Sequence, residues 1–158
     1  MVFDSEGMLA LEVEIAALRP ALVVIDPLIA YMGAKVDTYR ANQTRAILAP
    51  LAEIAERHDI SILAVRHLRK SESSRAIYRG QGSIDFTASA RSVLLAGHDP
   101  DYSSKCALVH IKGNLAALGK PTGYTIAEGD FSWTGTSNLT ADRILAVEGG
   151  GQALTAQH

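Results

Sequence analysis

The sequence has few of the residues that would tie it to a disulfide, a membrane or a highly charged partner. It contains one cysteine among 158 residues, which excludes an internal disulfide, and no Cys and His cluster has zinc spacing. No apolar run approaches the ~18 residues needed to cross a bilayer. The formal net charge of −2 gives no overall field that would recruit nucleic acid. We therefore expect a cytoplasmic protein without membrane contact, in which any charged binding surface is local.

Length and composition favour a single folded domain. A chain of 158 residues falls within the ~100 to 200 residues usual for one hydrophobic core. Apolar residues make up 47% of the chain and charged residues 20%, which is typical of a globular protein. The run Gly149-Gly150-Gly151 and the polar end that follows are typical of a linker or frayed tail. We predict one domain over residues 1–138 and a C-terminal tail or linker over residues 139–158.

Hydrophobic periodicity predicts strands that alternate with helices along most of the chain. The predicted helices cover residues 5–18, a long stretch capped by Asp37 and ending near residue 58, and short segments at 84–90 and 142–147. The predicted strands cover residues 21–25, 61–65, 92–96 and 107–111, and residues 123–134 form an antiparallel hairpin with a Gly turn. Alternating strands and helices indicate an α/β fold with right-handed crossovers. We expect a mixed, mainly parallel sheet with flanking helices and a C-terminal antiparallel hairpin.

Polar side chains follow the first two predicted strands. Asp26 comes directly after four apolar residues, a pattern in which a strand-end carboxylate holds the Mg²⁺ of a bound nucleotide. An Asp that ends a buried strand is also common in other α/β proteins. His67 follows the next strand along the chain. Because ligands sit at the carboxyl ends of parallel strands, we expect Asp26 and His67 to face one site.

The order and spacing of six segments resemble a known family over about residues 11–135. These segments are residues 22–27, 47–57, 65–70, 78–83, 90–93 and 111–116. They resemble the RecA-like P-loop ATPases of the hexameric plasmid replicative helicase RepA type. The resemblance implies a RecA-like, partial P-loop NTPase core whose function is that of a DNA helicase or another DNA-dependent motor. It also implies ATP and Mg²⁺ as cofactors of the complete family member, and a homo-oligomer.

The resemblance assigns roles to individual residues of this chain. Asp26 corresponds to the Walker B carboxylate, which binds Mg²⁺ through water. His67 corresponds to the polar residue that senses the γ-phosphate, and Arg66 stands where relatives commonly have another histidine. Arg91 corresponds to the arginine that reaches the γ-phosphate of the neighbouring subunit, and Lys112 to a second basic residue near the same interface.

Each of these residues also has a purely structural interpretation. His67 is alternatively a buried histidine that a backbone carbonyl satisfies. Arg91 follows the small residues Thr87 to Ala90 and is alternatively the C-terminal cap of a short helix. Lys112 is alternatively part of the polar exit of an edge strand.

A basic loop follows the second strand. Between residues 69 and 83 the chain has one acid, Glu72, and four cationic residues: Arg69, Lys70, Arg75 and Arg79. Such loops in RecA-like rings face the central channel and bind the phosphates of single-stranded DNA. The alternative is a solvated loop without a ligand.

The chain has no Gly-x-x-x-x-Gly-Lys-Ser/Thr motif, the loop whose amides hold the phosphates of a nucleotide. The nearest stretch, residues 113–121, has one residue too many between its glycines and a proline in place of the hydroxyl. We therefore expect the C-terminal half of an ATPase core, either a fragment that needs a missing N-terminal ATPase segment or a natural remnant. It is then a motor half that is inactive alone and active only when joined to the missing segment and assembled into a ring, or a non-catalytic module that binds nucleic acid or protein.

Overall fold

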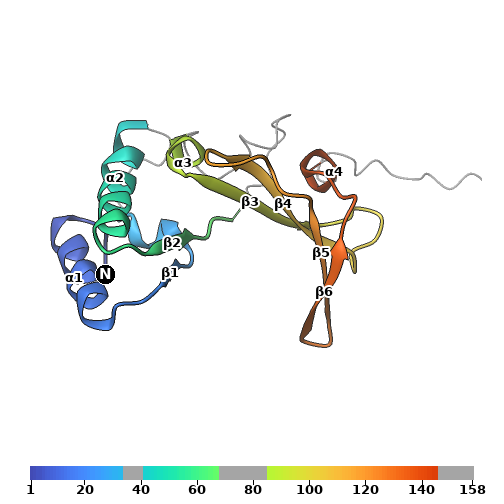
Figure 1. Cartoon of the computed structure of the whole chain (residues 1–158), viewed down its shortest axis with the longest axis horizontal. Helices are drawn as coiled ribbons and strands as arrows, with labels where there is room; N and C mark the ends of the chain where they lie inside the picture. Colours follow the sequence, from blue (N-terminus) through green and yellow to red (C-terminus); the bar gives the residue numbers. More distant parts are fainter. Residues whose placement is uncertain (34–40, 68–84, 146–158) are drawn as a thin grey trace, which may run out of the picture. The chain divides into compact units, whose positions relative to one another are not determined.

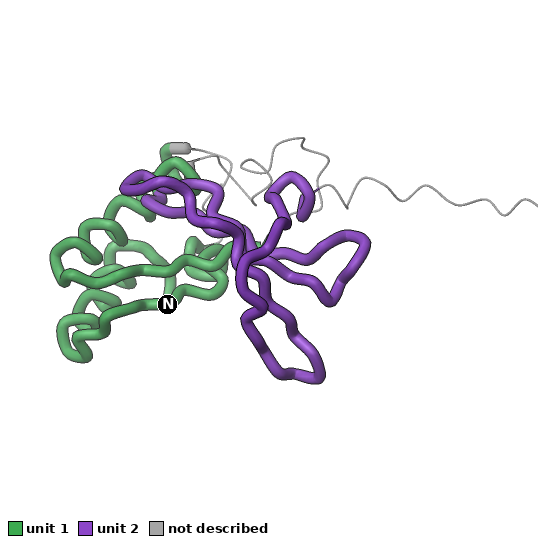
Figure 2. The backbone as a smooth tube through the Cα atoms, turned by 45° about the vertical axis from the view of Figure 1, so that its right-hand side comes forward, with its two compact units in different colours: residues 1–69, 80–89 green, residues 70–79, 90–158 purple. Residues whose placement is uncertain are grey.

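The computed structural model describes residues 1–33, 41–67 and 85–145. The chain divides into two compact units, which Figure 2 distinguishes by colour. Unit 1 comprises residues 1–69 and 80–89, and unit 2 comprises residues 70–79 and 90–158. Each unit has its own hydrophobic core. No helix within the described ranges is long and apolar enough to span a membrane.

Unit 1 is built from helices and two parallel strands (Figure 1). Its elements are α1 (Ser5–Leu18), β1 (Leu22–Ile25), the 3-10 helix η1 (Leu28–Tyr31), α2 (Ala41–Arg57), β2 (Ser61–Ala64) and α3 (Asp85–Ser89). β1 and β2 pair in parallel, with Leu22 opposite Ser61 and Ile25 opposite Ala64. The long α2 connects the two strands, as a parallel pair requires.

Local signals at both ends define α1. The side chain of Asp4 accepts a hydrogen bond from the Gly7 amide at 2.9 Å, which satisfies one of the free donors of the first turn. At the other end Arg19 adopts φ 48°, and its amide donates to the Ile15 carbonyl. Pro20 follows and has no amide with which to continue the helix. The helix predicted over residues 5–18 is confirmed.

Only one face of the β1–β2 pair is covered. Val23, Ile25 and Ile62 pack in the core of unit 1 together with apolar residues of α1 and α2. The alternate residues face away from it: Leu22 is 52% exposed, Val24 55% and Leu63 46%. The flanking helices that we expected therefore cover only one face of this pair in the described residues. Three large apolar side chains remain accessible on the second face of the pair.

A cluster of polar side chains joins α1 to α2. The carboxylate of Glu12 accepts hydrogen bonds from Arg57 and from Nε2 of His58, the second at 3.0 Å. The hydrogen bond from Arg57, followed by that from His58, holds the pKa of Glu12 below its ordinary value. The cluster therefore favours the ionised form of this carboxylate in the folded chain.

Unit 2 is a four-stranded antiparallel sheet with one short helix. Its elements are β3 (Ser92–His98), β4 (Cys106–Gly113), β5 (Thr122–Ala127), β6 (Asp130–Thr136) and α4 (Ala141–Leu145). The strands lie in the order β3-β4-β5-β6, and each pairs antiparallel with its neighbour. β5 and β6 are joined by Glu128 and Gly129, whose φ values of 53° and 92° suit a tight hairpin turn.

The core of unit 2 lies on the face of the sheet that α4 covers. Leu95, Ala107 and Val109 are buried there together with Leu139 and Leu145. Gly97 has no Cβ, and Ile144 of α4 occupies the space where a Cβ would lie. Leu139 and α4 thus pack in this core, C-terminal to the domain boundary predicted at residue 138.

The strand positions and the C-terminal hairpin follow the prediction, but the strand directions do not. The prediction of a mainly parallel sheet is wrong for the described strands, because one pair is parallel and three pairs are antiparallel. Residues 99–105 separate β3 from β4, and residues 114–121 separate β4 from β5. Both connections are shorter than the dozen residues that a parallel crossover requires. The fold is a mixed α/β fold with two separate sheets, and Asp37 lies outside the described residues.

We expect Glu12→Gln to reduce stability more at neutral pH than at low pH. A carboxyl group whose pKa is lowered by folding stabilises the fold above its unfolded pKa, and this stabilisation disappears as pH falls through the folded pKa. Urea unfolding at pH 7 and at about pH 3, below the usual Glu pKa of ~4.3, measures the difference. Glu14→Gln, on an exposed residue of the same helix, is the control. An equal loss at both pH values for Glu12→Gln would contradict the expectation.

Candidate functional site

Asp26 and His67 lie at the same edge of the parallel pair. Asp26 directly follows β1, and His67 stands three residues after the end of β2. Beyond the ladder, the Val65 amide donates to the Ile25 carbonyl at 2.8 Å and the Leu28 amide to the Val65 carbonyl at 2.9 Å. These two bonds fix the turn that carries Asp26 against the segment that leads to His67. Both side chains are exposed.

A small recess opens at this edge. It is lined by Leu28, Ile29, Arg66, His67 and Phe86. The guanidinium of Arg66 lies over the ring of Phe86, with 3.9 Å between Cζ and the ring centroid. Desolvation lowers the pKa of Arg66 to about 10, so the side chain remains charged at neutral pH. The ring therefore supports a cation that is partly withdrawn from water.

The residues at this edge fit a nucleotide phosphate with its Mg²⁺. Mg²⁺ keeps most of its waters and binds proteins through one or two carboxylates together with substrate phosphates, and Asp26 is an exposed carboxylate at this edge. The guanidinium of Arg66 belongs to a type of group that binds phosphate oxygens in other proteins. Among the described residues no group of three or more acidic, His or Cys side chains forms a complete metal site. The arrangement suits a metal that arrives with its nucleotide.

Arg91 and Lys112 lie together in unit 2, at the start of β3 and the end of β4. The carbonyl of Arg91 accepts a hydrogen bond from the Asn114 amide at 2.9 Å. Lys112 Nζ donates to the carbonyl of Ala90 at 2.7 Å, so Lys112 secures the segment that leads into Arg91. The side chain of Arg91 is exposed and forms no polar contact with the described residues. The structure thus brings Arg91 and Lys112 together, as it does Asp26 and His67 within unit 1.

A Ser–His contact in unit 2 is not arranged as a nucleophile and its base. His110 Nε2 lies 3.1 Å from Ser92 Oγ, and its Nδ1 accepts a hydrogen bond from the Gly119 amide at 3.1 Å. An Nδ1 that accepts from an amide carries no proton, so the proton of the neutral ring is on Nε2. Nε2 then donates to Ser92 and is not free to take its proton. The contact therefore ties the connection after β4 to the sheet.

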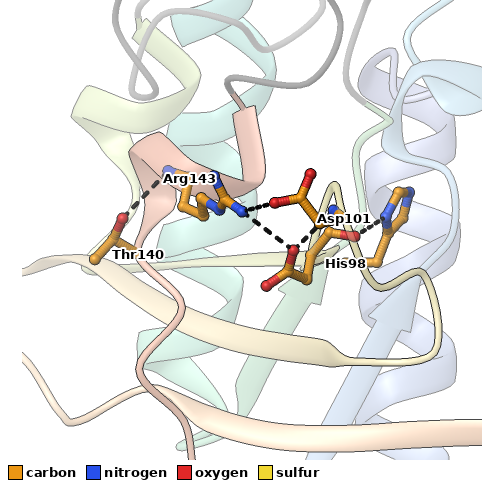
Figure 3. Close-up of polar contacts among 5 residues, drawn as sticks. His98, Asp101, Thr140 and Arg143 are labelled. Carbon is orange, nitrogen blue, oxygen red and sulfur yellow. Dashed lines mark hydrogen bonds and ion pairs between the residues drawn. The ribbon is translucent and has the colours of Figure 1, made fainter.

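A second polar cluster ties α4 to the connection between β3 and β4 (Figure 3). Arg143 forms ion pairs with Asp101 and with Asp99, and its amide donates to Thr140 Oγ1 at 3.2 Å. Nδ1 of His98 donates to the Asp99 carbonyl at 3.1 Å. The hydrogen bond to Asp101 raises the pKa of Arg143. Because the one guanidinium bridges both carboxylates, the cluster is a structural clamp.

The structural interpretation of His67 as a buried histidine is wrong, because its side chain is exposed. The basic loop residues Arg69, Lys70, Arg75 and Arg79 lie outside the described residues. Sequence reasoning did not assign a site role to Arg66 or Phe86, which line the recess beside His67. The sequence signal for Arg66 was its place directly before His67. Phe86 comes from a distant segment of the chain and had no such signal.

Comparison with known families relates the N-terminal part of the chain to ATPases. The profile of an AAA domain family, AAA_25, matches residues 4–73. The matched stretch covers α1, β1, α2 and β2 and includes Asp26 and His67. It supports a relationship to AAA-type P-loop ATPases, which use a nucleotide and Mg²⁺. A search of curated proteins finds no match to the chain.

We expect Asp26→Asn and His67→Gln to leave stability nearly unchanged. Both side chains are exposed, and exposed substitutions usually change the free energy of unfolding by no more than about 0.5 kcal/mol. Phe86→Ala is the contrasting variant, because the ring is buried in the core of unit 1, and we expect a loss of about 3–5 kcal/mol. Urea unfolding measures all three. A loss above about 1 kcal/mol in Asp26→Asn would show a structural role for this carboxylate.

Proposed function

We propose that this chain supplies the Walker B part of a RecA-like ATPase of the RepA helicase type, a DNA-dependent motor. Asp26 binds Mg²⁺ through water, and His67 senses the γ-phosphate. The phosphate-binding loop comes from a separate N-terminal ATPase segment, because no such motif occurs in this sequence. The chain alone is then an incomplete site for ATP.

One observation carries the proposal: the chain places Asp26 and His67 at the carboxyl edge of two parallel strands that pair in register. In open α/β sheets this edge is where nucleotides bind. The backbone bonds between Val65 and the turn after β1 hold the two residues in this relation without help from their side chains. Their side chains are therefore free to contact a ligand.

The neighbouring side chains have supporting roles in this proposal. Arg66 is charged and partly desolvated beside the recess, and it donates hydrogen bonds to phosphate oxygens. Phe86 positions Arg66 through the contact with its ring. Bound Mg²⁺ neutralises charge on the β- and γ-phosphates. Asp26 orients the waters of that ion, and His67 reports whether a γ-phosphate is present.

Arg91 acts on the site of a neighbouring copy, which makes a homo-oligomer part of the proposal. An arginine that stabilises transferring phosphoryl charge in a second subunit must be exposed and well positioned. Arg91 is exposed, and its backbone is tied to Asn114 while Lys112 secures the residue before it. Lys112 is thus a positioning residue. Single-stranded DNA would contact the basic loop, residues 69–79.

A non-catalytic module that binds protein or nucleic acid is the second candidate. The uncovered face of the β1–β2 pair favours it, because Leu22, Val24 and Leu63 present an apolar surface. Such a surface suits a protein partner. In the ATPase proposal the same face and the free edge of β2 receive the missing segment. The two candidates differ in whether that partner carries a phosphate-binding loop.

We expect the isolated chain not to hydrolyse ATP. An Mg²⁺ ligand without the amide cradle neither orients a triphosphate nor stabilises its transition state. A phosphate-release assay should give a turnover below ~0.01 s⁻¹, a rate that corresponds to a barrier of about 20 kcal/mol. Turnover above this rate that Asp26→Ala abolishes would reveal a phosphate site within this chain.

We expect Arg91→Ala to abolish turnover once a phosphate-loop segment has been joined to the N-terminus. A loss of ~10³- to 10⁵-fold with nearly unchanged nucleotide affinity is the result of removing an arginine finger. Arg143→Ala is the matched control, because Arg143 is an arginine of the same unit that only bridges two carboxylates. Turnover and fluorescent-nucleotide binding are measured on both variants. Full turnover in Arg91→Ala would make Arg91 structural.

A further inference from the structure

β6 is an edge strand of the sheet that the described strands of unit 2 form. It pairs with β5 and with no other described strand, and all seven of its residues are exposed. Ala127 and Asp130 flank a two-residue turn, so they form a hydrogen-bonded pair. Along an antiparallel ladder, hydrogen-bonded pairs alternate with non-hydrogen-bonded pairs, so Phe131 and Trp133 belong to the non-hydrogen-bonded pairs. The amides of Phe131 and Trp133 therefore point away from β5. The strand contains no lysine and no proline, and its pairing with β5 is interrupted only by an irregularity between Trp133 and Gly135.

The same hairpin carries a cluster of aromatic side chains on one face. Tyr124 stacks on Phe131 with ring centroids 5.4 Å apart, and Trp133 contacts both rings edge-on, at 6.1 Å and 4.9 Å. Phe131 is 51% exposed, Trp133 59% and the neighbouring Ile126 61%. Aromatic residues of this kind are enriched where proteins associate. The open edge of β6 adjoins the apolar face formed by Tyr124, Ile126, Phe131 and Trp133, and the edge and this face together are here called the β6 surface.

The charges around the β6 surface are arranged so that two antiparallel copies attract. The tip of the hairpin is acidic, with Glu128 and Asp130 exposed, and the exposed Lys120 lies at its base. Pro121 and Ser137, which a 2.8 Å hydrogen bond joins, mark this base. When two β6 strands pair antiparallel, the acidic tip of one copy lies beside the base of the other. With the two Trp133 residues opposite each other, Lys120 is two strand spacings across the sheet and two residues along it from Asp130 of the partner, about 12 Å, within reach of a lysine side chain.

We propose that the β6 surface binds a second copy of this chain, with the two β6 strands antiparallel about a two-fold axis. The pairing joins two four-stranded sheets into one sheet of eight strands. A two-fold axis perpendicular to the sheet keeps the aromatic residues of both copies on one face. The occupant is a second copy because the edge is self-complementary in backbone, in apolar side chains and in charge. The inference depends on unit 2 alone and is independent of the proposed ATP site.

The distance between the single cysteines of the two copies, Cys106, distinguishes this arrangement from a monomer. Cys106 lies opposite Tyr124, which lies opposite Trp133, so the three form one row across the sheet. In a β6–β6 dimer five strand spacings separate the two Cys106 residues, which gives about 24 Å. In a dimer through β3, the other edge strand, three spacings separate them across the sheet, but Cys106 lies opposite His98 at the end of β3, so the two residues also lie apart along the strands and their distance depends on register. A slip of two residues along β6 changes the first distance by only about 1 Å.

The experiment is pulsed electron spin resonance on the intact chain with a nitroxide label on Cys106, together with light scattering. We expect a mass of twice the 16.8 kDa chain and inter-label distances centred at about 20–35 Å, which allows for the label arms. A chain that is monomeric at about 100 µM overturns the proposal, because a dimer with Kd above that value is weaker than specific interfaces usually are. Distances centred outside this range would also overturn it.

Two sets of variants test the contacts. Trp133→Pro removes an outward amide, and Trp133→Val is its matched control with the amide retained. We expect the proline variant to raise the dimer Kd at least about tenfold above that of the valine variant, since two symmetric hydrogen bonds are lost. Lys120→Glu and Asp130→Lys should each weaken the dimer, and the double variant should restore it. Failure of the double variant to recover affinity would exclude the charge pairing and with it the antiparallel register.

A variant in unit 1 separates this dimer from association through the parallel pair. Leu63→Lys places a charge on the uncovered face beside the free edge of β2 and leaves the β6 surface intact. We expect the Kd of the dimer to stay unchanged in Leu63→Lys. If Leu63→Lys dissociates the dimer while Trp133→Pro does not, the second copy binds through unit 1 and the β6 proposal is wrong. The ATP site proposal is unaffected by either result.

Discussion

The parallel pairing of β1 with β2 is the constraint on which the candidate site depends. Four residues of each strand align in register, and two further backbone bonds extend the contact to Val65 and Leu28. Parallel strands end at the same edge, so the residues that follow them become neighbours although about forty positions separate them in the chain. The side chains of Asp26 and His67 are not needed for this arrangement. A site whose geometry is set by backbone bonds keeps its side chains available for a ligand.

The same pair is also the least complete part of the fold. Among the described strands β1 and β2 pair only with each other, and one face of the pair is uncovered, with Leu22, Val24 and Leu63 exposed. Exposed apolar area of this kind contributes nothing to stability and marks a contact surface. The core on the other face, from α1, α2 and Phe86, must therefore supply most of the stability of unit 1. The proposed N-terminal segment would remove this asymmetry, because that segment would cover the exposed face of the β1–β2 pair and pair with the edge of β2.

The sequence predicted the elements of this fold better than their connections. Asp4, Arg19 and Pro20 define α1 through local capping, and such signals act within a few residues. Strand direction depends on which strands meet, and here the short connection at residues 99–105 decides it, a signal of length that periodicity does not contain. For the site, the edge position of Asp26 and His67 followed from strand order. The recess could not be predicted from strand order, because the contact of Arg66 with Phe86 that forms it joins segments twenty residues apart.

The four predicted site residues fall into two groups, and the proposed chemistry accounts for this division. Asp26 and His67 belong to unit 1, whereas Arg91 and Lys112 belong to unit 2. A metal ligand and a phosphate sensor act on the nucleotide bound by their own copy, so they must share one edge of one sheet. An arginine that acts on a neighbouring copy has no such requirement; it must be exposed and its backbone fixed, as Asn114 and Lys112 fix the segment of Arg91. In this scheme the exposure of Arg91 is the property that its role demands, since a guanidinium already paired within its own chain could not reach a second subunit.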